Sequence, residues 1–201
     1  MASEGGEKPQ VSGESHVAVK RSNGWVIPTL RVVAFMATAA ATITMAANKQ
    51  TKSFVVATIG TTPVKITITA KFQHTPAFVF FVVANGMGSL HNLLMLVVEL
   101  GGHKFDFKGL RLLLIPILDM MTVSLVSGGA SAAAFMGELG RNGNSHARWD
   151  KICDKFDSFC DHGGGAILAS FAGVLLLIIL TAMSIIRIRN LNSQPLKSLV
   201  P

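Results

Sequence analysis

Charged residues are scarce in this chain of 201 residues: they make up 14% of it, whereas 50% of the residues are hydrophobic. Soluble domains carry close to twice that share of charge, so the composition is typical of an integral membrane protein. Enzyme signatures are missing too. The sequence has no glycine-rich phosphate loop, no nucleophile elbow and no paired metal-binding histidine motif. We therefore expect a membrane protein that is not an enzyme and uses neither a cofactor nor a metal.

Three further absences narrow the possibilities. No N-x-S/T glycosylation sequon is present. The net charge of +7 does not indicate nucleic-acid binding, because the basic residues are spread over five polar segments and form no single patch. A cleavable signal peptide is also not expected. The first apolar run begins after about two dozen polar residues and is long enough to span a bilayer, so it would act as a signal anchor.

Four apolar segments are present, each long enough to cross a hydrocarbon core of about 30 Å. They cover residues 27–47, 77–98, 112–136 and 166–186. Since they hold most of the apolar residues, no separate soluble domain is expected and the core must lie between helices. The sequence predicts an all-α membrane protein, a four-transmembrane-helix bundle over 27–186.

The polar segments supply the rest of the organisation. We expect a disordered cytosolic tail over 1–26, outer loops over 48–76 and 137–165, and a cytosolic tail over 187–201. Counting Lys and Arg does not orient the bundle, because nine fall on the side of the termini and eight on the other. Basic pairs closely flank the first and last spans, and both cysteines lie in one loop, where an oxidising compartment would preserve a disulfide. These features favour cytosolic termini.

Two ionisable residues lie inside apolar spans: Arg31 in the first and Asp119 in the third. Such residues usually pair or carry function. At 1.5 Å per residue, Arg31 lies roughly 6 Å and Asp119 roughly 10 Å from the inner ends of their spans. His91, in the second span, lies at a similar depth of roughly 10 Å, with Asn85 and Asn92 nearby.

This layer allows three interpretations. Arg31 and Asp119 can form a buried ion pair between the first and third helices. Alternatively, Asp119, His91 and Arg31 form a proton or ion relay. In the third case Arg31 extends to the headgroups while Asp119 is protonated or hydrogen-bonded to Asn or Ser. We favour the ion pair, because a relay normally places several acids or histidines along the membrane depth.

Small residues recur within the spans, often four apart. Such faces allow helices to approach closely, within one bundle or between neighbouring copies. The expected packing positions are Ala34, Thr38, Gly88, Ser124, Gly128, Ala132 and Gly173.

The first outer loop contains two segments with β-strand character, 54–59 and 64–69, separated by a Gly-Thr-Thr-Pro turn sequence. This pattern predicts a small β-hairpin. The loop has four lysines and no acid, so Lys65 and Lys71 are candidates for contact with a negatively charged extracellular partner. A solvated basic face explains them equally well.

In the second outer loop, Trp149, Cys153, Phe156 and Cys160 recur at helical spacing, which predicts a short amphipathic helix. Trp149 and Phe156 are candidate extracellular contacts. Cysteines seven apart on a straight helix would be about 10.5 Å apart, too far for a disulfide. A Cys153–Cys160 bond therefore requires the chain to turn near Asp157. Metal binding with His146 or His162 is the alternative, although the spacing matches no common zinc pattern.

Several of these features together resemble the Casparian strip membrane domain protein family of plants, in particular its CASP-like branch. They are the four spans, Arg31 and Asp119, the KFxHTPAFVFFVVANG sequence entering the second span, and the W-x3-C-x6-C loop. The resemblance covers nearly the whole chain after the N-terminal tail. It implies a plasma-membrane four-helix protein related to the MARVEL group. By position, Arg31 and Asp119 match the intramembrane charges of the family, and Cys153 and Cys160 match its loop cysteines.

The resemblance also implies a function. Members form homo- and hetero-oligomers, and the founding members build an immobile scaffold that recruits wall-modifying enzymes. The founding members have an acidic and aromatic stretch before the second span, whereas this chain has the basic VKITITAKFQHTPAF. The expected function is therefore membrane scaffolding, with the bilayer, related copies and a cell-wall or other extracellular component as partners. The alternative is a small channel or transporter subunit with Arg31, His91 and Asp119 lining an inner polar layer.

Overall fold

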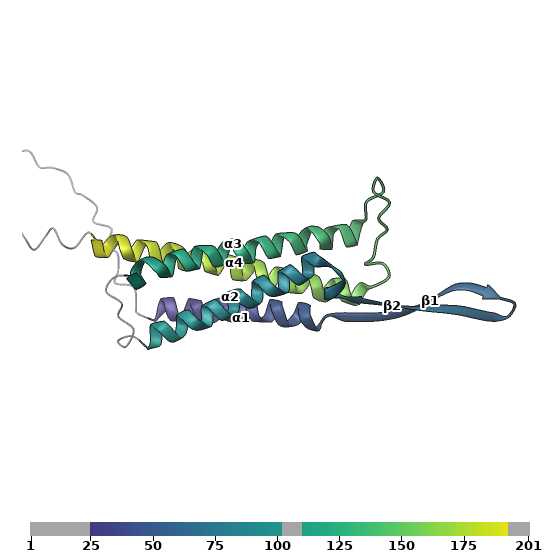
Figure 1. Cartoon of the computed structure of the whole chain (residues 1–201), viewed down its shortest axis with the longest axis horizontal. Helices are drawn as coiled ribbons and strands as arrows, with labels where there is room; N and C mark the ends of the chain where they lie inside the picture. The colour runs from purple at the N-terminus through teal and green to yellow at the C-terminus, as the bar shows by residue number, and fades with distance from the viewer. Residues whose placement is uncertain (1–24, 102–109, 193–201) are drawn as a thin grey trace, which may run out of the picture.

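The computed structural model describes residues 25–101 and 110–192. Its four helices are α1 (Val26–Ala47), α2 (Pro76–Leu100), α3 (Leu110–Asn142) and α4 (Asp157–Asn192), and a β-hairpin follows α1 (Figure 1). All four helices are long and apolar enough to cross a membrane. The prediction of a four-helix membrane bundle with a small hairpin is confirmed. Residues 1–24 of the tail predicted over 1–26, and 193–201 of the tail predicted over 187–201, lie outside the described residues.

The helices form a square in which α1 packs on α2 and α4, and α3 packs on the same two neighbours. As a result, α1 and α3 lie on one diagonal, and α2 and α4 on the other. Two helices extend furthest beyond the predicted spans: α3 continues to Asn142, past the predicted end at Met136, and α4 is longer at both ends. α4 begins at Asp157 and continues to Asn192, into the segment assigned to the C-terminal tail. Hydropathy locates only the part of a helix inside the hydrocarbon, so polar turns that continue a helix beyond it escape such a prediction.

The buried face of α1 explains how the bundle closes. Its buried residues alternate in steps of three and four and are Arg31, Ala34, Thr38, Ala41 and Met45. This spacing keeps one narrow stripe facing the partner helices. Most of the stripe is small, which permits close helix approach in a bilayer. Larger side chains from other helices, such as Phe81 of α2 and Leu177 of α4, fill the remaining space.

The hairpin consists of β1 (Lys49–Ile59) and β2 (Thr62–Lys71), paired antiparallel with an irregularity between Val55 and Ala57. Both strands are longer than predicted, and the turn is shorter, because Thr62 and Pro63 already pair with β1. Gly60 adopts a φ of 65°, a conformation that glycine accepts without steric cost. The hairpin projects from the end of the bundle along its long axis (Figure 1).

The two faces of the hairpin differ in chemistry. Residues paired across an antiparallel ladder share a face, and neighbours along a strand alternate. One face carries hydroxyls joined across the strands, Thr51 to Thr69 at 2.9 Å and Ser53 to Thr67 at 3.0 Å. The opposite face is largely apolar and carries Phe54, Ala57, Ile59, Val64, Ile66 and Ile68.

The separate short helix predicted in the second outer loop is not formed. Residues 143–156, all of which the structure describes, form turns and one isolated bridge between Asn144 and Trp149. Gly143 and Arg148 both have positive φ, which no continuous right-handed helix accommodates. The helical spacing of Trp149, Cys153 and Phe156 was misleading because the disulfide and these turns, rather than an apolar stripe, fix the loop.

Candidate functional site

Arg31 reaches across the α1–α3 diagonal near the end of the bundle where α1 begins and α4 ends, which we call the inner end; the hairpin lies at the opposite, outer end. Its Nη1 donates to Oδ1 of Asp119 at 3.1 Å, and its Nη2 donates to Oδ2 at 2.9 Å. Both side chains are completely buried. The structure therefore places these two residues in the bidentate arrangement that suits a planar guanidinium and a carboxylate. It does not extend Arg31 toward the headgroups.

Every helix contributes to this cluster. From α2, Glu99 accepts a hydrogen bond from Arg31 Nε at 2.8 Å, and His91 Nε2 lies 2.7 Å from Asp119 Oδ1. From α4, the hydroxyl of Ser184 donates to Asp119 Oδ2 at 3.5 Å. We call Arg31, His91, Glu99, Asp119 and Ser184 the inner polar cluster.

The sequence analysis did not predict that Glu99 and Ser184 belong to this cluster. Glu99 follows directly after the span predicted over 77–98, so its position gave no reason to expect it inside the bundle. A signal for it existed: Asn85, Asn92 and Glu99 recur every seven residues, so they share one face of α2. Ser184 carried no comparable signal, since a serine near a span end is commonly solvated or bonded to its own backbone.

Within the inner polar cluster, Arg31 and Asp119 are extensively hydrogen-bonded, whereas Glu99 Oε2 is buried without a partner among the described residues. Both oxygens of Asp119 accept bonds, and the Nε, Nη1 and Nη2 groups of Arg31 all donate. A buried pair satisfied in this way is costly to break, because removal of one partner leaves an uncompensated charge. The arrangement can hold the helices in register, because its members come from all four helices and bond to one another.

A second polar contact joins the other diagonal. Ser170 of α4 donates to Asn85 Oδ1 of α2 at 2.8 Å, and both residues are fully buried. Asn85 therefore does not join the layer of Asp119 but forms a separate tie closer to the outer side. The sequence did not predict this contact, because Ser170 had no signal beyond being a small residue in a span.

The predicted packing positions divide into two groups. Ala34, Thr38, Gly88 and Gly173 are buried, and a Cβ at either glycine would lie within 3.0 Å of a neighbouring side chain. Ser124 and Gly128 of α3 are instead exposed on the outside of the bundle, and Ala132 is half-buried.

On α3, the close contact to α2 is made by the neighbouring Gly129. A Cβ there would lie 2.8 Å from the Cβ of Ala84 and 3.3 Å from the Cα of Phe81. A Cβ at Gly128 would meet only the ring of Phe80, at 3.8 Å and beyond. The four-residue spacing thus identified a small-residue face but not which of two adjacent glycines faces the bundle interior.

At the outer end, Cys153 and Cys160 form a disulfide with a Cα–Cα distance of 5.7 Å. The predicted disulfide is confirmed, and the metal-binding alternative is wrong because both sulfurs are consumed. As required for such short spacing, the chain turns between the two cysteines: Asp157 begins α4 and Cys160 lies in its first turn. The disulfide thereby fastens the second loop to the start of α4.

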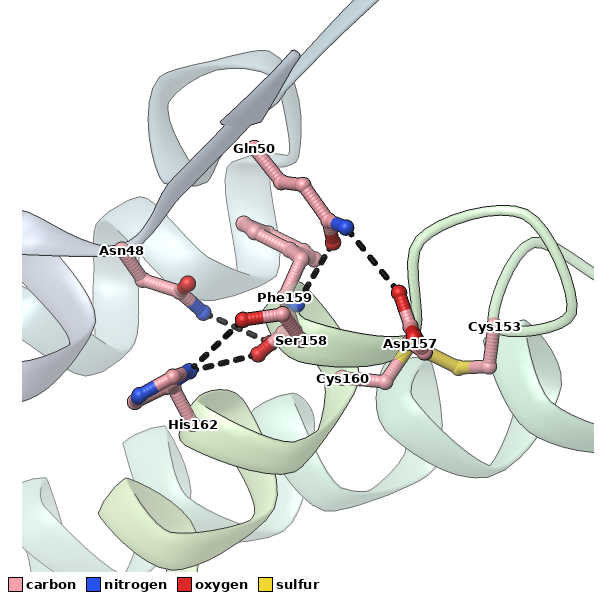
Figure 2. The surroundings of a disulfide bond; sticks show 8 residues. All are labelled: Asn48, Gln50, Cys153, Asp157, Ser158, Phe159, Cys160 and His162. Carbon is pink, nitrogen blue, oxygen red and sulfur yellow. Dashed lines mark hydrogen bonds between the residues drawn. A yellow bond between two sulfur atoms is a disulfide. The ribbon is translucent and has the colours of Figure 1, made fainter. Parts of the chain in front are cut away.

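The same turn of α4 is fastened to the base of the hairpin (Figure 2). Asn48 donates to the carbonyl of Phe159 at 2.7 Å, and the amide of Phe159 donates to Gln50 Oε1 at 2.8 Å. Gln50 and Lys52 both donate to Asp157 Oδ1, at 3.0 and 2.9 Å. The two outer loops therefore form one unit at the mouth of the bundle.

The predicted extracellular contacts differ in their availability. Lys65 and Trp149 are exposed, and Lys71 is half-buried at the hairpin base. Phe156 is buried against the ring of Phe54, so it is not available to an extracellular partner, contrary to the prediction. Its apolar side chain instead fills the junction of the two loops.

A cleft of about 950 Å³ lies between the hairpin base, the outer end of α3 and the disulfide loop. Its lining combines apolar side chains such as Ile152 and Ile167 with the carboxylates of Glu138, Asp150 and Asp154.

Comparison with known proteins agrees with this architecture. Residues 20–176 match the family model described as the Casparian strip membrane protein domain. CASP-like protein 1B1 of Populus trichocarpa is 70% identical over 164 residues, which cover 82% of this chain and 84% of the relative. CASP-like protein 1B2 of the same species is 63% identical over 188 residues, 94% of each chain. CASP-like protein 1B2 of Arabidopsis thaliana is 62% identical over 159 residues, 79% of this chain and 81% of the relative.

No solved structure matches the chain. The family match covers most of the sequence, and the relatives align over nearly their whole lengths. With four membrane-spanning helices and the loop disulfide, the chain is a multi-pass membrane protein that belongs to the Casparian strip membrane protein domain family.

Proposed function

We propose that this protein is a non-enzymatic scaffold of the plasma membrane that oligomerises and organises membrane domains. The inner polar cluster carries the proposal. Its ionisable groups bond to one another across the bundle, and Arg31 and Asp119 are fully buried. Such a bundle is suited to be a rigid building block, and the surfaces left for recognition lie on its outside.

Two surfaces support assembly. On α3, Ser124 and Gly128 form a small-residue face that points away from the bundle, the type of face on which membrane helices associate. Outside the membrane, the apolar hairpin face is exposed toward its tip, with Ile59 72% and Ile66 49% accessible. Exposed apolar surface of this kind commonly marks a contact site. Expected partners are further copies, related family members and cell-wall or other extracellular components.

The proposed orientation places both termini in the cytosol. The disulfide and the hairpin then lie on the extracellular side, where the bond is maintained by the oxidising environment. The projection of the hairpin beyond the bundle makes it the part that reaches furthest from the membrane on that side (Figure 1).

Photobleaching recovery of a fluorescently tagged protein in the plasma membrane tests scaffolding. We expect slow and incomplete recovery, and faster recovery for Gly128→Leu, which places a bulky side chain on the exposed face of α3. A tagged single-span protein serves as the mobile control. Recovery of the wild-type protein as fast as that control would contradict the proposal.

The alternative function, a channel, would require the inner polar cluster to be accessible to water or ions. A conducting bundle needs water or ions to reach Asp119, whereas its oxygens are occupied by Arg31, His91 and Ser184. Reconstituted vesicles decide between the two: we expect no ion flux above that of empty vesicles. Flux that disappears in Asp119→Asn would favour the channel.

A further inference from the structure

Charged side chains at the outer end are unevenly distributed around the cleft that adjoins the disulfide loop. The two outer loops, 48–76 and 137–165, are fully described and contain eight Lys and Arg residues and five Asp and Glu residues. Of the basic residues only Lys71 and Arg141 line the cleft, together with the imidazole of His74. All five acids line it: Glu138, Asp150, Asp154, Asp157 and Asp161. An outer end that is basic as a whole therefore encloses one acidic cleft.

Most of these carboxylates are not neutralised by the chain itself. Asp157 is paired with Lys52 at 2.9 Å. The other four acids have no ion-pair partner among the residues that the structure describes. Glu138 accepts a hydrogen bond from Asn142, whose side chain is neutral. Like charges that line one cleft repel one another, so a cation that enters it is attracted by several carboxylates at once.

A second part of the lining is apolar and lies at the level of the hydrocarbon. It comprises residues inside the spans predicted from the sequence, among them Phe78, Ala134, Met136, Ile167 and Leu168. None of the five acids lies in one of those spans. Leu168 lies eleven residues after the start of α4, about 16 Å along the helix, and is 72% exposed. The cleft therefore leads from the membrane surface into the bilayer and opens toward the surrounding lipid.

The polar part of the lining offers groups for both charges of a zwitterion. The indole of Trp149 lines the cleft and is 52% exposed, and the face of such a ring attracts ammonium groups. The guanidinium of Arg141 and the ammonium of Lys71 suit a phosphate. A molecule that combines an amine, a phosphate and an apolar tail thus matches every part of the lining.

We propose that the cleft binds a phospholipid from the leaflet at the outer end, one whose head group carries a positively charged amine. An acyl chain lies along Ile167 and Leu168, the amine lies among the carboxylates, and the phosphate contacts Arg141 or Lys71. The volume of about 950 Å³ is within the range of sites that bind small molecules. A basic segment of a second copy matches the acids as well, but it does not match the apolar part at the level of the hydrocarbon.

Native mass spectrometry of the full-length protein released from nanodiscs tests this site. The discs hold equal amounts of phosphatidylcholine, which has the amine, and phosphatidylglycerol, which lacks it, with the same acyl chains. An unspecific lipid shell around a protein of net charge +7 favours the anionic phosphatidylglycerol. We expect the opposite: two carboxylate contacts of the strength usual at exposed sites enrich phosphatidylcholine about tenfold among the retained lipids. Equal retention of the two lipids, or an excess of phosphatidylglycerol, would overturn the proposal.

Two adjacent glycines of α4 provide a matched steric test. A Cβ at Gly164 or at Gly165 would meet no atom within 4 Å, but only Gly164 lines the cleft. We expect Gly164→Leu to fill the cleft and abolish the enrichment of phosphatidylcholine, whereas Gly165→Leu keeps it. Tm in the same lipid checks that both variants are folded. An enrichment that both variants keep, or that both lose, would show that the lipid is not bound in the cleft.

The double variant Asp150→Asn with Asp154→Asn tests the charge of the cleft, since both carboxylates are exposed within it. We expect it to lose the enrichment of phosphatidylcholine and to keep the oligomeric state of the wild-type protein. The matched control, Lys151→Gln with Lys155→Gln, alters exposed charges of the same loop outside the cleft and should keep the enrichment. Enrichment that persists in the aspartate variant contradicts the proposal. If its oligomers dissociate at the same time, the acids bind a second copy instead of a lipid.

Discussion

Two ion pairs in this protein have the same nitrogen-to-oxygen distance of 2.9 Å, but they lie in opposite environments. Arg31 and Asp119 are both fully buried at the inner end of the bundle. Lys52 and Asp157 join the hairpin to α4, with 39% and 71% of their side chains exposed. Distance alone does not determine what an ion pair does: removal of one partner of a buried pair leaves a buried charge uncompensated, whereas water and salt screen an exposed pair.

The same contrast applies to the regions around the two pairs. At the inner end, polar side chains from all four helices are joined by hydrogen bonds. At the outer end, a disulfide and a few hydrogen bonds hold two loops together, and much apolar surface stays exposed on the hairpin. The inner region is thus held by buried polar contacts, whereas the outer region leaves apolar surface exposed.

Removal of one partner of the buried pair should have the largest effect. Arg31→Ala leaves the carboxylates of Asp119 and Glu99 without the guanidinium that contacts both, and Asp119→Asn removes the bidentate carboxylate of Arg31, which keeps only its contact with Glu99. We expect the free energy of unfolding to fall by about 3–5 kcal/mol, and the yield of monodisperse protein to drop sharply. The double variant should lose less than the two single losses combined. Normal folding and trafficking of both single variants would exclude a clamp between α1 and α3.

Removal of the disulfide should affect the outer region alone. Replacing Cys153 and Cys160 together by Ser is expected to cost about 2–3 kcal/mol of local stability, because a short closed loop is released. Hydrogen exchange should become faster over 143–160 and stay slow in the buried turns around Ala34 and Thr38. Equal acceleration in both regions would show that the two ends are not independent.

The adjacent glycines of α3 distinguish the interior of the bundle from its outside. Gly129→Ala should cost about 1–3 kcal/mol, since its new Cβ approaches the Cβ of Ala84 too closely. Gly128→Ala, the matched control, should leave Tm unchanged. Thermal unfolding of both variants in the same lipid checks this difference. Equal changes in Tm for the two variants would show that Gly129 does not face α2, so that α3 is rotated differently about its axis.

Loss of the exposed ion pair should have the smallest effect. Lys52→Ala is expected to leave Tm within experimental error, because Asp157 keeps the hydrogen bond from Gln50 and contact with water. A loss comparable to that of Arg31→Ala would contradict the contrast between the two pairs.

The sequence predicted the parts of the fold whose cause is local. Long apolar runs located the spans, alternation of apolar and polar residues located the hairpin, and an Arg and an Asp in hydrocarbon implied a partner for each. Glu99, Ser184 and Ser170 could not be assigned in this way. Their roles depend on how each helix is rotated about its axis relative to its neighbours. The hydrophobic pattern of a single helix does not define that rotation.

The second outer loop shows a different limit. Trp149, Cys153 and Phe156 have helical spacing, yet the loop is made of turns closed by a disulfide. Spacing reports an apolar face only where the backbone is regular. Here Phe156 is buried because the hairpin folds against it, a contact between segments about one hundred residues apart in sequence.

Native mass spectrometry of the protein released from lipid nanodiscs shows whether the closed bundle assembles through its outer surfaces. We predict oligomers for the wild-type protein and a shift toward monomers for Gly128→Leu, with an unchanged Tm for the variant. A wild-type protein that is monomeric at all ratios of protein to lipid would contradict the account.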